Sequence, residues 1–232
     1  MKIEFEDREL EKFVMQGESC IAVPIEVFVP KDGECVVTVY SAFENIARKF
    51  AEKFKNDPLC EDAEAFIKEK FSALMKEAGY EYDGRFCHRI IHFAADSSTK
   101  LCQSEIKPVK ISTNYEFERY YNYATRDVEF DDEDELDVCF AVVEDGKILS
   151  FAAVNDISDD ESLEINVETS VESRGKGYAT AAVAALTEYL ISKGEKVSYK
   201  CRVTNSASCR VAEKAGLEKI GESYSFVCYA DA

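Results

Sequence analysis

Hydrophobic residues recur with a helical rhythm in the first third of this 232-residue chain. Spacings of three and four place side chains on one face of a helix, so two helices are predicted before Gly79. The first helix has an apolar face formed by Tyr40, Phe43, Ala47, Phe50 and Phe54. The second begins at a cap within residues 56–58, and its apolar face contains Ala63, Phe66, Ile67, Phe71, Leu74 and Met75. Ahead of both, residues 20–29 are rich in β-forming residues, and Pro24 among them indicates an edge strand or a bulge.

The last third of the chain begins with a strand rhythm. Two apolar runs, 138–143 and 148–154, are separated by a segment that contains Asp145-Gly146, a pair typical of hairpin turns. Residues 163–169 then alternate between apolar and polar positions, which predicts a strand with one buried face.

A glycine-containing segment follows this strand and leads into a helix that ends near Gly194. The apolar side of this helix contains Ala179, Ala182, Val183, Leu186 and Leu190. A strand at 197–203, a short helix at 207–215 closed by Gly216, and a strand at 220–229 complete the pattern. The sequence therefore predicts a mixed α/β fold with a cofactor site where a strand leads into a helix.

Composition narrows the class of protein. Hydrophobic residues make up 46% of the chain, which is enough for a buried core. Apolar runs fall short of the ~20 residues that a membrane helix needs, and residues 1–7 carry acids where a signal peptide would be basic and then apolar. We therefore expect a cytoplasmic protein with no membrane partner.

The nine cysteines are widely spaced, and no Cys-x-x-Cys pair occurs among them. A disulfide framework or a zinc site would need closer, paired spacing. Several cysteines, such as Cys139, lie within apolar runs, where a thiol acts as a small core residue. We expect free thiols in a reducing compartment.

Acidic residues outnumber basic ones by 46 to 28, which gives a formal net charge of −18. Such a surface repels phosphate backbones and argues against a nucleic-acid partner. It is suited to attracting a cationic substrate such as an amine, although acidity also simply maintains solubility.

The segment Arg174-Gly175-Lys176-Gly177 has the composition of a phosphate-binding turn. Glycine lets the backbone turn sharply and approach a ligand closely, and the first amides of the following helix have no partners within it. These amides carry partial positive charge and suit a pyrophosphate. A P-loop would need Ser or Thr after Lys176, and a dinucleotide fingerprint would need a third glycine where the chain has Thr180.

Residues 174–179 resemble the Arg/Gln-x-x-Gly-x-Gly/Ala motif of the GNAT superfamily of N-acetyltransferases. The motif stands where that family has it, after a central strand and at the start of the longest helix of the domain. Asn205-Ser206-Ala207-Ser208, followed by Ala215-Gly216-Leu217, is similar to a later segment of the family, and the spacing between the two motifs also fits.

The resemblance covers roughly residues 110–232 and implies a GNAT-like α/β (α+β) fold, with a mixed, mostly antiparallel sheet and flanking helices. We expect the GNAT-like acetyltransferase domain at residues 101–232. A smaller α/β region of unknown role is expected at residues 1–100.

The resemblance also implies acetyl-CoA as co-substrate and no metal. The pantetheine arm would pair with the backbone of Val167, Glu168 and Thr169. The pyrophosphate would lie on the amides of Arg174, Gly175, Lys176, Gly177, Tyr178 and Ala179, with Thr180 nearby. Asn205 and Ser208 would contact the cofactor from the other side, where two neighbouring strands splay apart.

The chain departs from the family at the positions that handle protons. Family members often have a tyrosine in the short helix to protonate the leaving thiolate, and the corresponding residue here is Ala212. Some members have a glutamate base on the preceding strand, where this chain has Lys200. The proton-transfer groups must therefore be sought elsewhere.

Glu164 and Glu168 are candidate bases, because they share a strand face with Asn166 and a partly buried carboxylate beside a thioester can accept a proton. The alternative is that this row of side chains is simply solvated. Tyr224, or Tyr229, is a candidate acid in the terminal strand, though strand tyrosines are more often packing residues.

Three further groups of residues contain side chains that are candidates for a functional role. His88 and His92 would share a helix face, but residues 86–93 fit a strand equally well, so a metal site is not expected. The acidic run 127–137 lacks the spacing of a calcium loop and is interpreted as a solvated loop, with attraction of a cationic substrate as the alternative. An aromatic group either walls an acceptor pocket or packs in the core: Tyr115, Phe117, Tyr120, Tyr121 and Tyr123.

The leading hypothesis is an N-acetyltransferase that moves an acetyl group from acetyl-CoA to a primary amine of a small molecule, by direct attack. A homodimer is left open. The alternative is a non-catalytic module that binds acyl-CoA as a sensor. A third hypothesis, acetylation of a protein N-terminus or lysine, would need an open groove.

Overall fold

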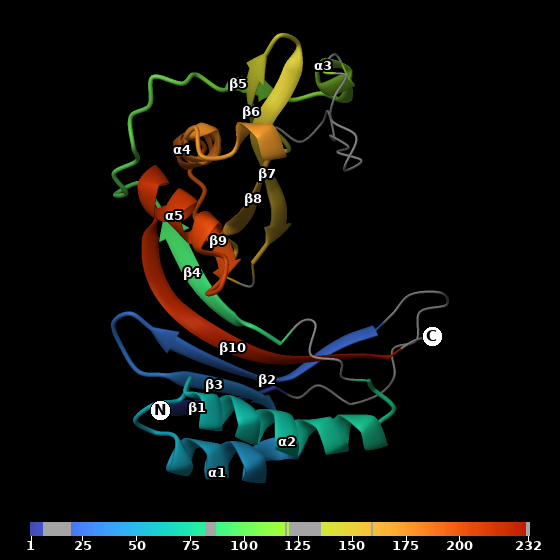
Figure 1. Ribbon diagram of the computed structural model, residues 1–232. Coiled ribbons are helices and arrows are strands. Elements are labelled where there is room, and N and C mark those ends of the chain that lie inside the picture. The colour runs from blue at the N-terminus through green and yellow to red at the C-terminus, as the bar shows by residue number, and fades with distance from the viewer. Residues whose placement is uncertain (7–19, 82–86, 119, 121–135, 159, 231–232) are drawn as a thin grey trace. The chain divides into compact units, whose positions relative to one another are not determined.

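The computed structural model of the chain describes residues 1–6, 20–81, 87–118, 120, 136–158 and 160–230 (Figure 1). The chain divides into two compact units. Unit 1 comprises Met1–Ile91 together with Ile220–Ala232, and unit 2 comprises His92–Lys219. This division differs from the boundary expected between residues 100 and 101, since the C-terminal strand is grouped with the N-terminal residues.

Unit 1 is built on a sheet with the strand order β1-β3-β2-β10. Its strands are β1 (Lys2–Glu6), β2 (Cys20–Pro30), β3 (Val36–Tyr40) and β10 (Glu218–Ala230). Strand β1 runs parallel to β3, and β2 runs antiparallel to both β3 and β10. The pairing of β10 with β2 extends from Gly221↔Pro30 to Ala230↔Cys20, which explains why the C-terminal strand belongs to this unit.

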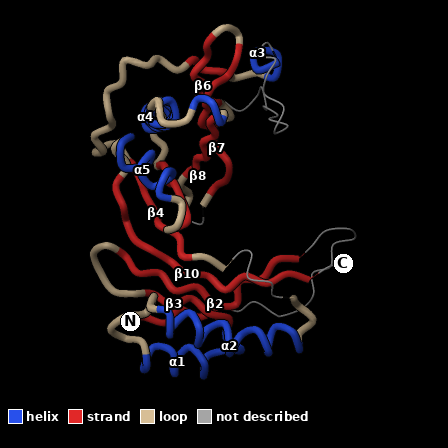
Figure 2. Tube along the Cα trace, viewed as in Figure 1, coloured by secondary structure: helices blue, strands red, loops and turns tan. Residues whose placement is uncertain are grey.

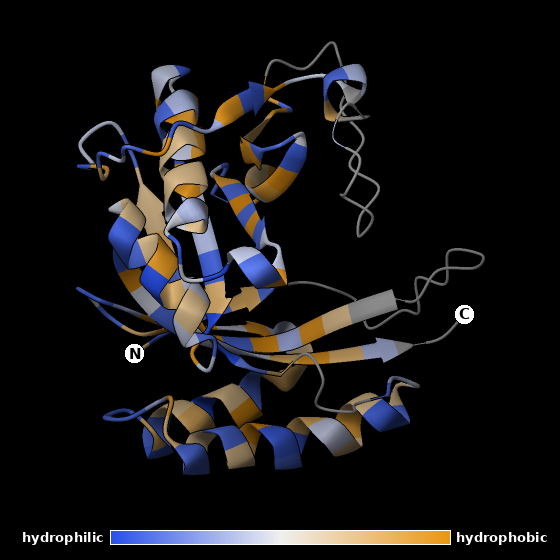
Figure 3. Ribbon diagram, turned by 45° about the horizontal axis from the view of Figure 1, so that its top comes forward, coloured by the Kyte–Doolittle hydropathy of each residue, from blue (hydrophilic) through white to orange (hydrophobic). Residues whose placement is uncertain are grey.

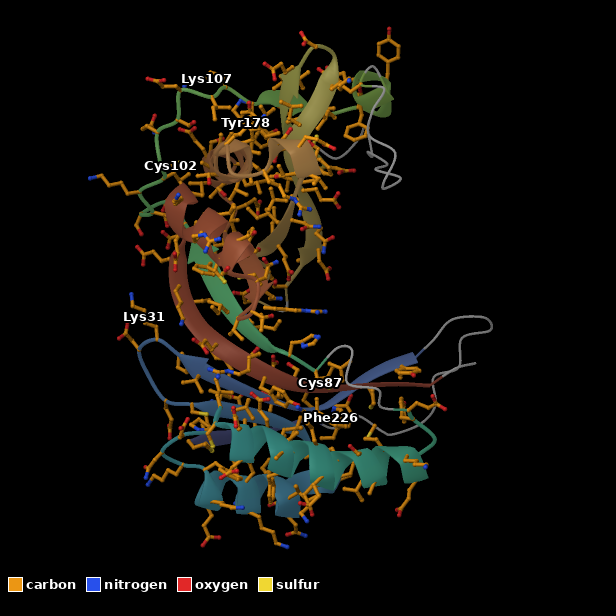
Figure 4. The ribbon with its side chains drawn as sticks, in the orientation of Figure 1. Lys31, Cys87, Cys102, Lys107, Tyr178 and Phe226 are labelled. Carbon is orange, nitrogen blue, oxygen red and sulfur yellow. The ribbon has the colours of Figure 1, made fainter. Side chains whose placement is uncertain are left out.

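Three helical segments follow β3 in unit 1: η1 (Ser41–Phe43), α1 (Glu44–Lys53) and α2 (Glu61–Glu77). Helices α1 and α2 lie together along one face of the sheet (Figure 2), and both carry hydrophobic and hydrophilic bands (Figure 3). Their apolar bands enter the core, where the ring of Phe71 lies 5.2 Å from Phe43 and 5.9 Å from Phe226 on β10 (Figure 4). The predicted apolar faces are therefore buried, apart from Phe66 and Leu74, which are partly buried.

Two helix boundaries differ from the prediction. Helix α1 begins at Glu44, because Tyr40 ends β3 with extended backbone (φ −61°, ψ 136°) and Ser41–Phe43 form the 3-10 turn η1. Helix α2 begins at Glu61 instead of within 56–58, because the chain needs these residues to turn between the two helices, and Leu59 in that turn is buried. Periodicity identifies which side chains are buried, but an extended residue at the end of a strand can fit the same spacing.

Pro24 lies at a bulge. Strand β2 is paired on both sides, so it is not an edge strand. Its register with β10 shifts between Phe226 and Cys228, opposite Pro24, and its pairing with β3 stops at Ile25↔Val39. Proline has no amide hydrogen, so it is tolerated where the ladder is interrupted. Of the two alternatives, the bulge is correct.

Unit 2 contains a sheet with the order β9-β8-β7-β6-β5, and β4 lies beside β9. Its strands are β4 (Arg89–Ala95, which starts in unit 1), β5 (Val109–Ile111), β6 (Cys139–Glu144), β7 (Lys147–Ile157), β8 (Leu163–Thr169) and β9 (Val197–Arg202). Its helical segments are α3 (Asn114–Glu118), η2 (Val171–Ser173), α4 (Tyr178–Ser192) and α5 (Ser206–Ala215). The pairs β5–β6, β6–β7 and β7–β8 are antiparallel, whereas β8 pairs with β9 in parallel. This is the mixed, mostly antiparallel sheet with flanking helices that the sequence predicted.

Helix α4 covers the sheet of unit 2 by packing against β6, β7 and β8. It buries Ala182, Val183, Leu186 and Leu190, as its periodicity predicted, whereas Ala179 of the predicted face is only partly buried. The hairpin between β6 and β7 turns at Asp145 (φ 50°) and Gly146 (φ 73°), two positive φ values that match the Asp-Gly signal.

Two further expectations concern the whole chain. In the part of the chain that the structure describes, no helix is both long and apolar enough to cross a membrane. Apart from Cys20, the cysteines of the chain are free thiols.

Candidate functional site

Strands β8 and β9 pair at their beginnings and then diverge. Their parallel pairing comprises Leu163↔Val197 and Glu164↔Ser198, after which β8 continues to Thr169 and β9 to Arg202. The other edge of β8 stays paired with β7 as far as Thr169. Within these described strands, the later half of β8 therefore offers backbone hydrogen-bonding groups on the side away from β7, where an extended ligand can bind.

The open end of β8 is held in place from β7 by a buried hydroxyl. The Oγ atom of Ser150, which is fully buried, donates to the carbonyl oxygen of Glu168 at 2.8 Å. It also lies 2.8 Å from Oγ1 of Thr169. These contacts fix the end of β8 although it has lost its partner on the other side.

The glycine turn follows directly and ends at the N-terminus of α4. Gly175 (φ 77°) and Gly177 (φ 84°) both have left-handed backbone, which glycine adopts without steric cost. Gly177 is the N-cap of α4, no side chain caps the helix, and its first turn has no acidic residue. The first amides of α4, beginning at Tyr178 (Figure 4), therefore lack helical partners and favour an anion.

A cavity of about 550 Å³ lies between the end of β8, the glycine turn, the start of α4 and α5. A volume of this size is typical of small-molecule sites. All of the residues expected to bind the cofactor line it except Lys176: Val167, Glu168, Thr169, Arg174, Gly175, Gly177, Tyr178, Ala179, Thr180, Asn205 and Ser208. The structure thus brings together in one cavity residues that the sequence separates by up to 41 positions.

Residues that sequence reasoning did not identify also line the cavity. They are Ser173 and a group on α5, namely Ala207, Arg210, Val211 and Lys214. The α5 residues recur at spacings of three and four, so they share one face of the helix. That periodicity was visible in the sequence, but it does not reveal that this face borders a ligand site.

The cavity is positively charged although the chain as a whole has a net charge of −18. Arg174, Arg210 and Lys214 line it, and Glu168 is the acidic residue among the described lining residues. Within the part of the chain that the structure describes, none of these cations has an ion-pair partner. Unpaired cations around helix amides favour a ligand with several negative charges.

The junction of β9 and α5 is fixed by contacts on both sides of Asn205. Oδ1 of Asn205 accepts a hydrogen bond from the Ser208 amide at 3.2 Å and so caps α5. Oγ of Ser208 lies 2.7 Å from the hydroxyl of Tyr199, a residue whose pKa burial raises. The Sγ atoms of Cys201 and Cys209 lie 3.1 Å apart across the same junction. The capping role of Asn205 is a structural function that accompanies its expected contact with the cofactor.

The two candidate bases have different surroundings. Glu168 lines the cavity, whereas Oε2 of Glu164 forms an ion pair with Nζ of Lys200 at 2.7 Å. Nζ of Lys200 also donates to Oγ of Ser158 at 3.3 Å. Lys200, at the position where some relatives have a glutamate base, thus acts as a structural partner of Glu164, and Glu168 is the carboxylate that faces the ligand space.

The candidate acids are not placed at this cavity. Tyr224 is 1% exposed and belongs to the hydrophobic core of unit 1, the packing role that was weighed for it. Ala212, at the position of the family's tyrosine, is fully buried in α5. Tyr229 lies on β10 in unit 1, with its hydroxyl 3.4 Å from Oε2 of Glu81.

The histidines are on or next to a strand. His92 lies within β4, so the strand interpretation of 86–93 holds for residues 89–93, whereas Cys87 and His88 precede the strand. Burial lowers the pKa of His92 to about 4, and the nearby charge of Lys200 adds to the effect. Among the described residues, no group of three or more His, Cys, Asp or Glu side chains is arranged to hold a metal ion.

The remaining candidate groups are described in part. Phe117 is buried in the core around β5, β6 and β7, whereas Tyr115 is 76% exposed. Tyr121, Tyr123 and most of the acidic run 127–137 lie outside the described residues.

Comparison with known families gives one match, the acetyltransferase (GNAT) domain, over residues 91–218. This is nearly the range of unit 2. No curated protein matches the chain in sequence.

Solved structures of the same kind of domain are similar at low identity. An acetyltransferase of the GNAT family from Novosphingobium aromaticivorans is 14% identical with a TM-score of 0.49, covering 66% of this chain and 68% of its own. One from Colwellia psychrerythraea is 12% identical with a TM-score of 0.48, covering 86% of this chain and 81% of its own. A GCN5-related N-acetyltransferase from Kribbella flavida is 13% identical with a TM-score of 0.48, covering 93% and 90% respectively.

Proposed function

The chain belongs to the GNAT family of acetyltransferases, and from this premise we propose that unit 2 transfers an acetyl group from acetyl-CoA to a primary amine of a small molecule. The observation that carries the proposal is the cavity beside β8, where an open strand edge, free helix amides and three cations without an ion-pair partner among the described residues meet.

The residues of the cavity fit the parts of acetyl-CoA. The open edge of β8 at Val167–Thr169 suits the amide-containing pantetheine arm. The first amides of α4 and the Arg174 side chain suit the pyrophosphate. Asn205 and Ser208 face the same space from α5. No single feature is specific to CoA, but the open strand edge, the helix amides and the cations line one cavity.

Acetyl-CoA would supply a thioester, and the nitrogen of a neutral amine would bond to its carbonyl carbon. The carbon–sulfur bond would then break, the nitrogen would lose a proton as the amide forms, and the leaving sulfur would take up a proton to give CoA-SH. Glu168 is our candidate for the group that removes the amine proton, because it is the acidic residue among the described cavity residues. Ser150 donates a hydrogen bond to the backbone carbonyl oxygen of Glu168 and so fixes the backbone position from which the Glu168 side chain extends.

An amine acceptor agrees with the charge of the chain. At a net charge of −18, the protein attracts cations from solution, and a protonated amine is a cation that becomes a nucleophile after losing one proton. The charge acts over the whole surface and does not distinguish one amine from another.

A non-catalytic acyl-CoA-binding module is the second candidate. Two observations favour it: Ala212 occupies the family's tyrosine position, and Lys200 at the glutamate position is engaged by Glu164 at 2.7 Å. The cofactor cavity is the same in both proposals, so turnover must distinguish them.

Thiol release from acetyl-CoA, followed with a chromogenic thiol reagent, tests the function. We expect release to depend on added small amines, because the thioester must be attacked for CoA-SH to form. Glu168→Gln should lower kcat by about a hundredfold, the usual contribution of a general base, while Glu164→Gln serves as the matched control outside the cavity and should change it little. Binding without amine-dependent release would favour the sensor module, and equal loss in both variants would remove Glu168 from its role. Release with peptides alone would indicate a protein acceptor.

A further inference from the structure

Two cysteines lie against each other where β9 leads into α5. Cys201 belongs to β9 and Cys209 to the first turn of α5, and their Sγ atoms are 3.1 Å apart. A disulfide bond is about 2.0 Å long, so the two sulfur atoms need to approach by about 1 Å to bond. Neither cysteine is among the described residues that line the cavity, so the pair is a feature separate from the ligand site.

This contact between two sulfur atoms differs from the surroundings of other thiols in the chain. The Sγ atoms of Cys87 and Cys228 lie 3.4 Å and 3.5 Å from backbone carbonyl oxygens, and both residues are buried. Such thiols act as small core residues. Cys201 and Cys209, by contrast, are placed so that each sulfur is within reach of the other, as thiol–disulfide chemistry requires.

The two thiols differ in their access to solvent. Cys209 is partly exposed, whereas Cys201 is only 6% exposed. Burial raises the pKa of Cys201 to about 12, and its contact with Cys209 adds to the effect. A small oxidant in solution therefore reaches Cys209 first, and Cys201 remains beside it as a protonated thiol that can act as the resolving partner.

We propose that Cys201 and Cys209 are a site of oxidation by peroxide, at which they form a reversible disulfide between β9 and α5. The thiolate of Cys209 attacks one oxygen of hydrogen peroxide, the O–O bond breaks, and the second oxygen leaves as water, so that Cys209 becomes a sulfenic acid. Sγ of Cys201 then bonds to Sγ of Cys209, the S–O bond breaks, and the hydroxyl leaves as a second water with the Cys201 proton. The two thiols lose two electrons and two protons in all, and the peroxide takes them up. An added dithiol reverses the step by thiol–disulfide exchange.

The disulfide joins the strand and the helix on either side of two cavity residues. Asn205 and Ser208 lie between the cysteines in sequence, and both line the cavity. The junction already depends on close contacts there, since the Asn205 side chain caps α5 and Oγ of Ser208 lies 2.7 Å from the Tyr199 hydroxyl. Oxidation therefore cross-links this wall of the cavity to β9. Because the sulfur chemistry needs no ligand, the inference does not depend on the proposed function.

Mass spectrometry of the full chain after treatment with hydrogen peroxide tests the site. The protein is reduced, freed of reductant, treated, alkylated with iodoacetamide under denaturing conditions and digested. The unmodified chain should give a Cys201–Cys209 disulfide within one molecule, lose alkylation at these two residues, and regain it after dithiothreitol. Cys201→Ser should leave a sulfenic acid on Cys209 that dimedone captures, and Cys209→Ser should leave Cys201 unoxidised because it is buried.

Cys60→Ser is the matched control, because Cys60 is also a partly exposed thiol but lies at the start of α2 in unit 1. It should form the disulfide as the unmodified chain does. The proposal is overturned if peroxide leaves both thiols of the unmodified chain alkylatable, or if Cys209 is oxidised to a sulfinic acid with Cys201 still free. Oxidation of Cys201 in Cys209→Ser to the same extent as in the unmodified chain would also overturn it. Since Cys201 is buried, circular dichroism checks the folding of its variant, and the peptide map of the unmodified chain decides alone if that variant does not fold.

Discussion

Lys200 acts on two nearby side chains, Glu164 and His92. Its Nζ atom pairs with Glu164, and its charge adds to the burial that lowers the pKa of His92 to about 4. Glu164 is thereby used for structure, and His92 is kept neutral. The sequence could not distinguish Glu164 from Glu168 as a base, because an alternating strand shows a shared face but not what faces it.

His92 makes stability depend on pH in a defined window. Its pKa is about 4 when folded and near 6.5 when unfolded, so below pH 6.5 the unfolded chain binds a proton that the folded chain does not, and stability falls as pH drops toward 4. We expect a loss on the order of 1–2 kcal/mol between pH 7.5 and pH 5, since partial exposure reduces the full effect. Urea unfolding at the two pH values measures it, and His92→Gln should lose correspondingly less.

The control for this experiment is His88→Gln, which removes the histidine that lies just before the same strand. It should show the pH dependence of the unmodified chain. If His92→Gln loses as much stability as the unmodified chain between pH 7.5 and pH 5, the neutral buried imidazole is not the cause.

At the scale of elements, the C-terminal end of α5 is fixed by close backbone contacts with another segment of unit 2. Gly216 ends α5 with left-handed backbone (φ 102°), and the chain at Lys100 and Leu101 passes directly against it. The amide of Cys102 also donates to the carbonyl oxygen of Ala215 at 2.9 Å. This contact fixes the end of the helix that bears Arg210 and Lys214.

Gly216→Ala should destabilise unit 2 by about 3 kcal/mol or more. A Cβ atom there would lie 2.5 Å from the Lys100 carbonyl oxygen, and the left-handed backbone adds about 1–2 kcal/mol of strain. Gly194 has nearly the same φ of 94° and nothing within 4 Å of a Cβ position, so Gly194→Ala should lose only the stability that the backbone strain costs. Thermal or urea unfolding of both variants measures the difference, and equal losses would mean that the contact with residues 100–101 is not tight.

Element order was predictable because periodicity and turn chemistry are local properties. The Asp145-Gly146 hairpin and the burial of α4 follow from such signals and were confirmed. The start of α2 was not, because residues 56–58 have the composition of a cap while the turn between two packed helices extends to Cys60. Likewise, the sequence did not identify Arg210 and Lys214 as residues of the site, because only the fold shows that their face of α5 lines the cavity.

For the whole molecule, the residues matched by the family and the residues of unit 2 have nearly the same bounds. Unit 2 spans 92–219 and the match spans 91–218. The sequence resemblance extended to residue 232, because the final strand follows α5 in the expected order. Its pairing with β2 is a long-range contact, which no local pattern reveals.

The central claim, that the cavity at the glycine turn binds acetyl-CoA, is tested most directly by calorimetric titration of the full chain with acetyl-CoA, with ATP and NAD in parallel. We predict saturable binding of acetyl-CoA alone and a loss of at least about a hundredfold in Gly177→Glu, because a carboxylate would stand at the helix amides. A Cβ at Gly177 would meet Ile106 at an ordinary 3.8 Å, so this variant should fold, and Gly194→Glu matches its backbone strain at the other end of α4. Unchanged acetyl-CoA affinity in Gly177→Glu, or binding of ATP or NAD in its place, would contradict the account.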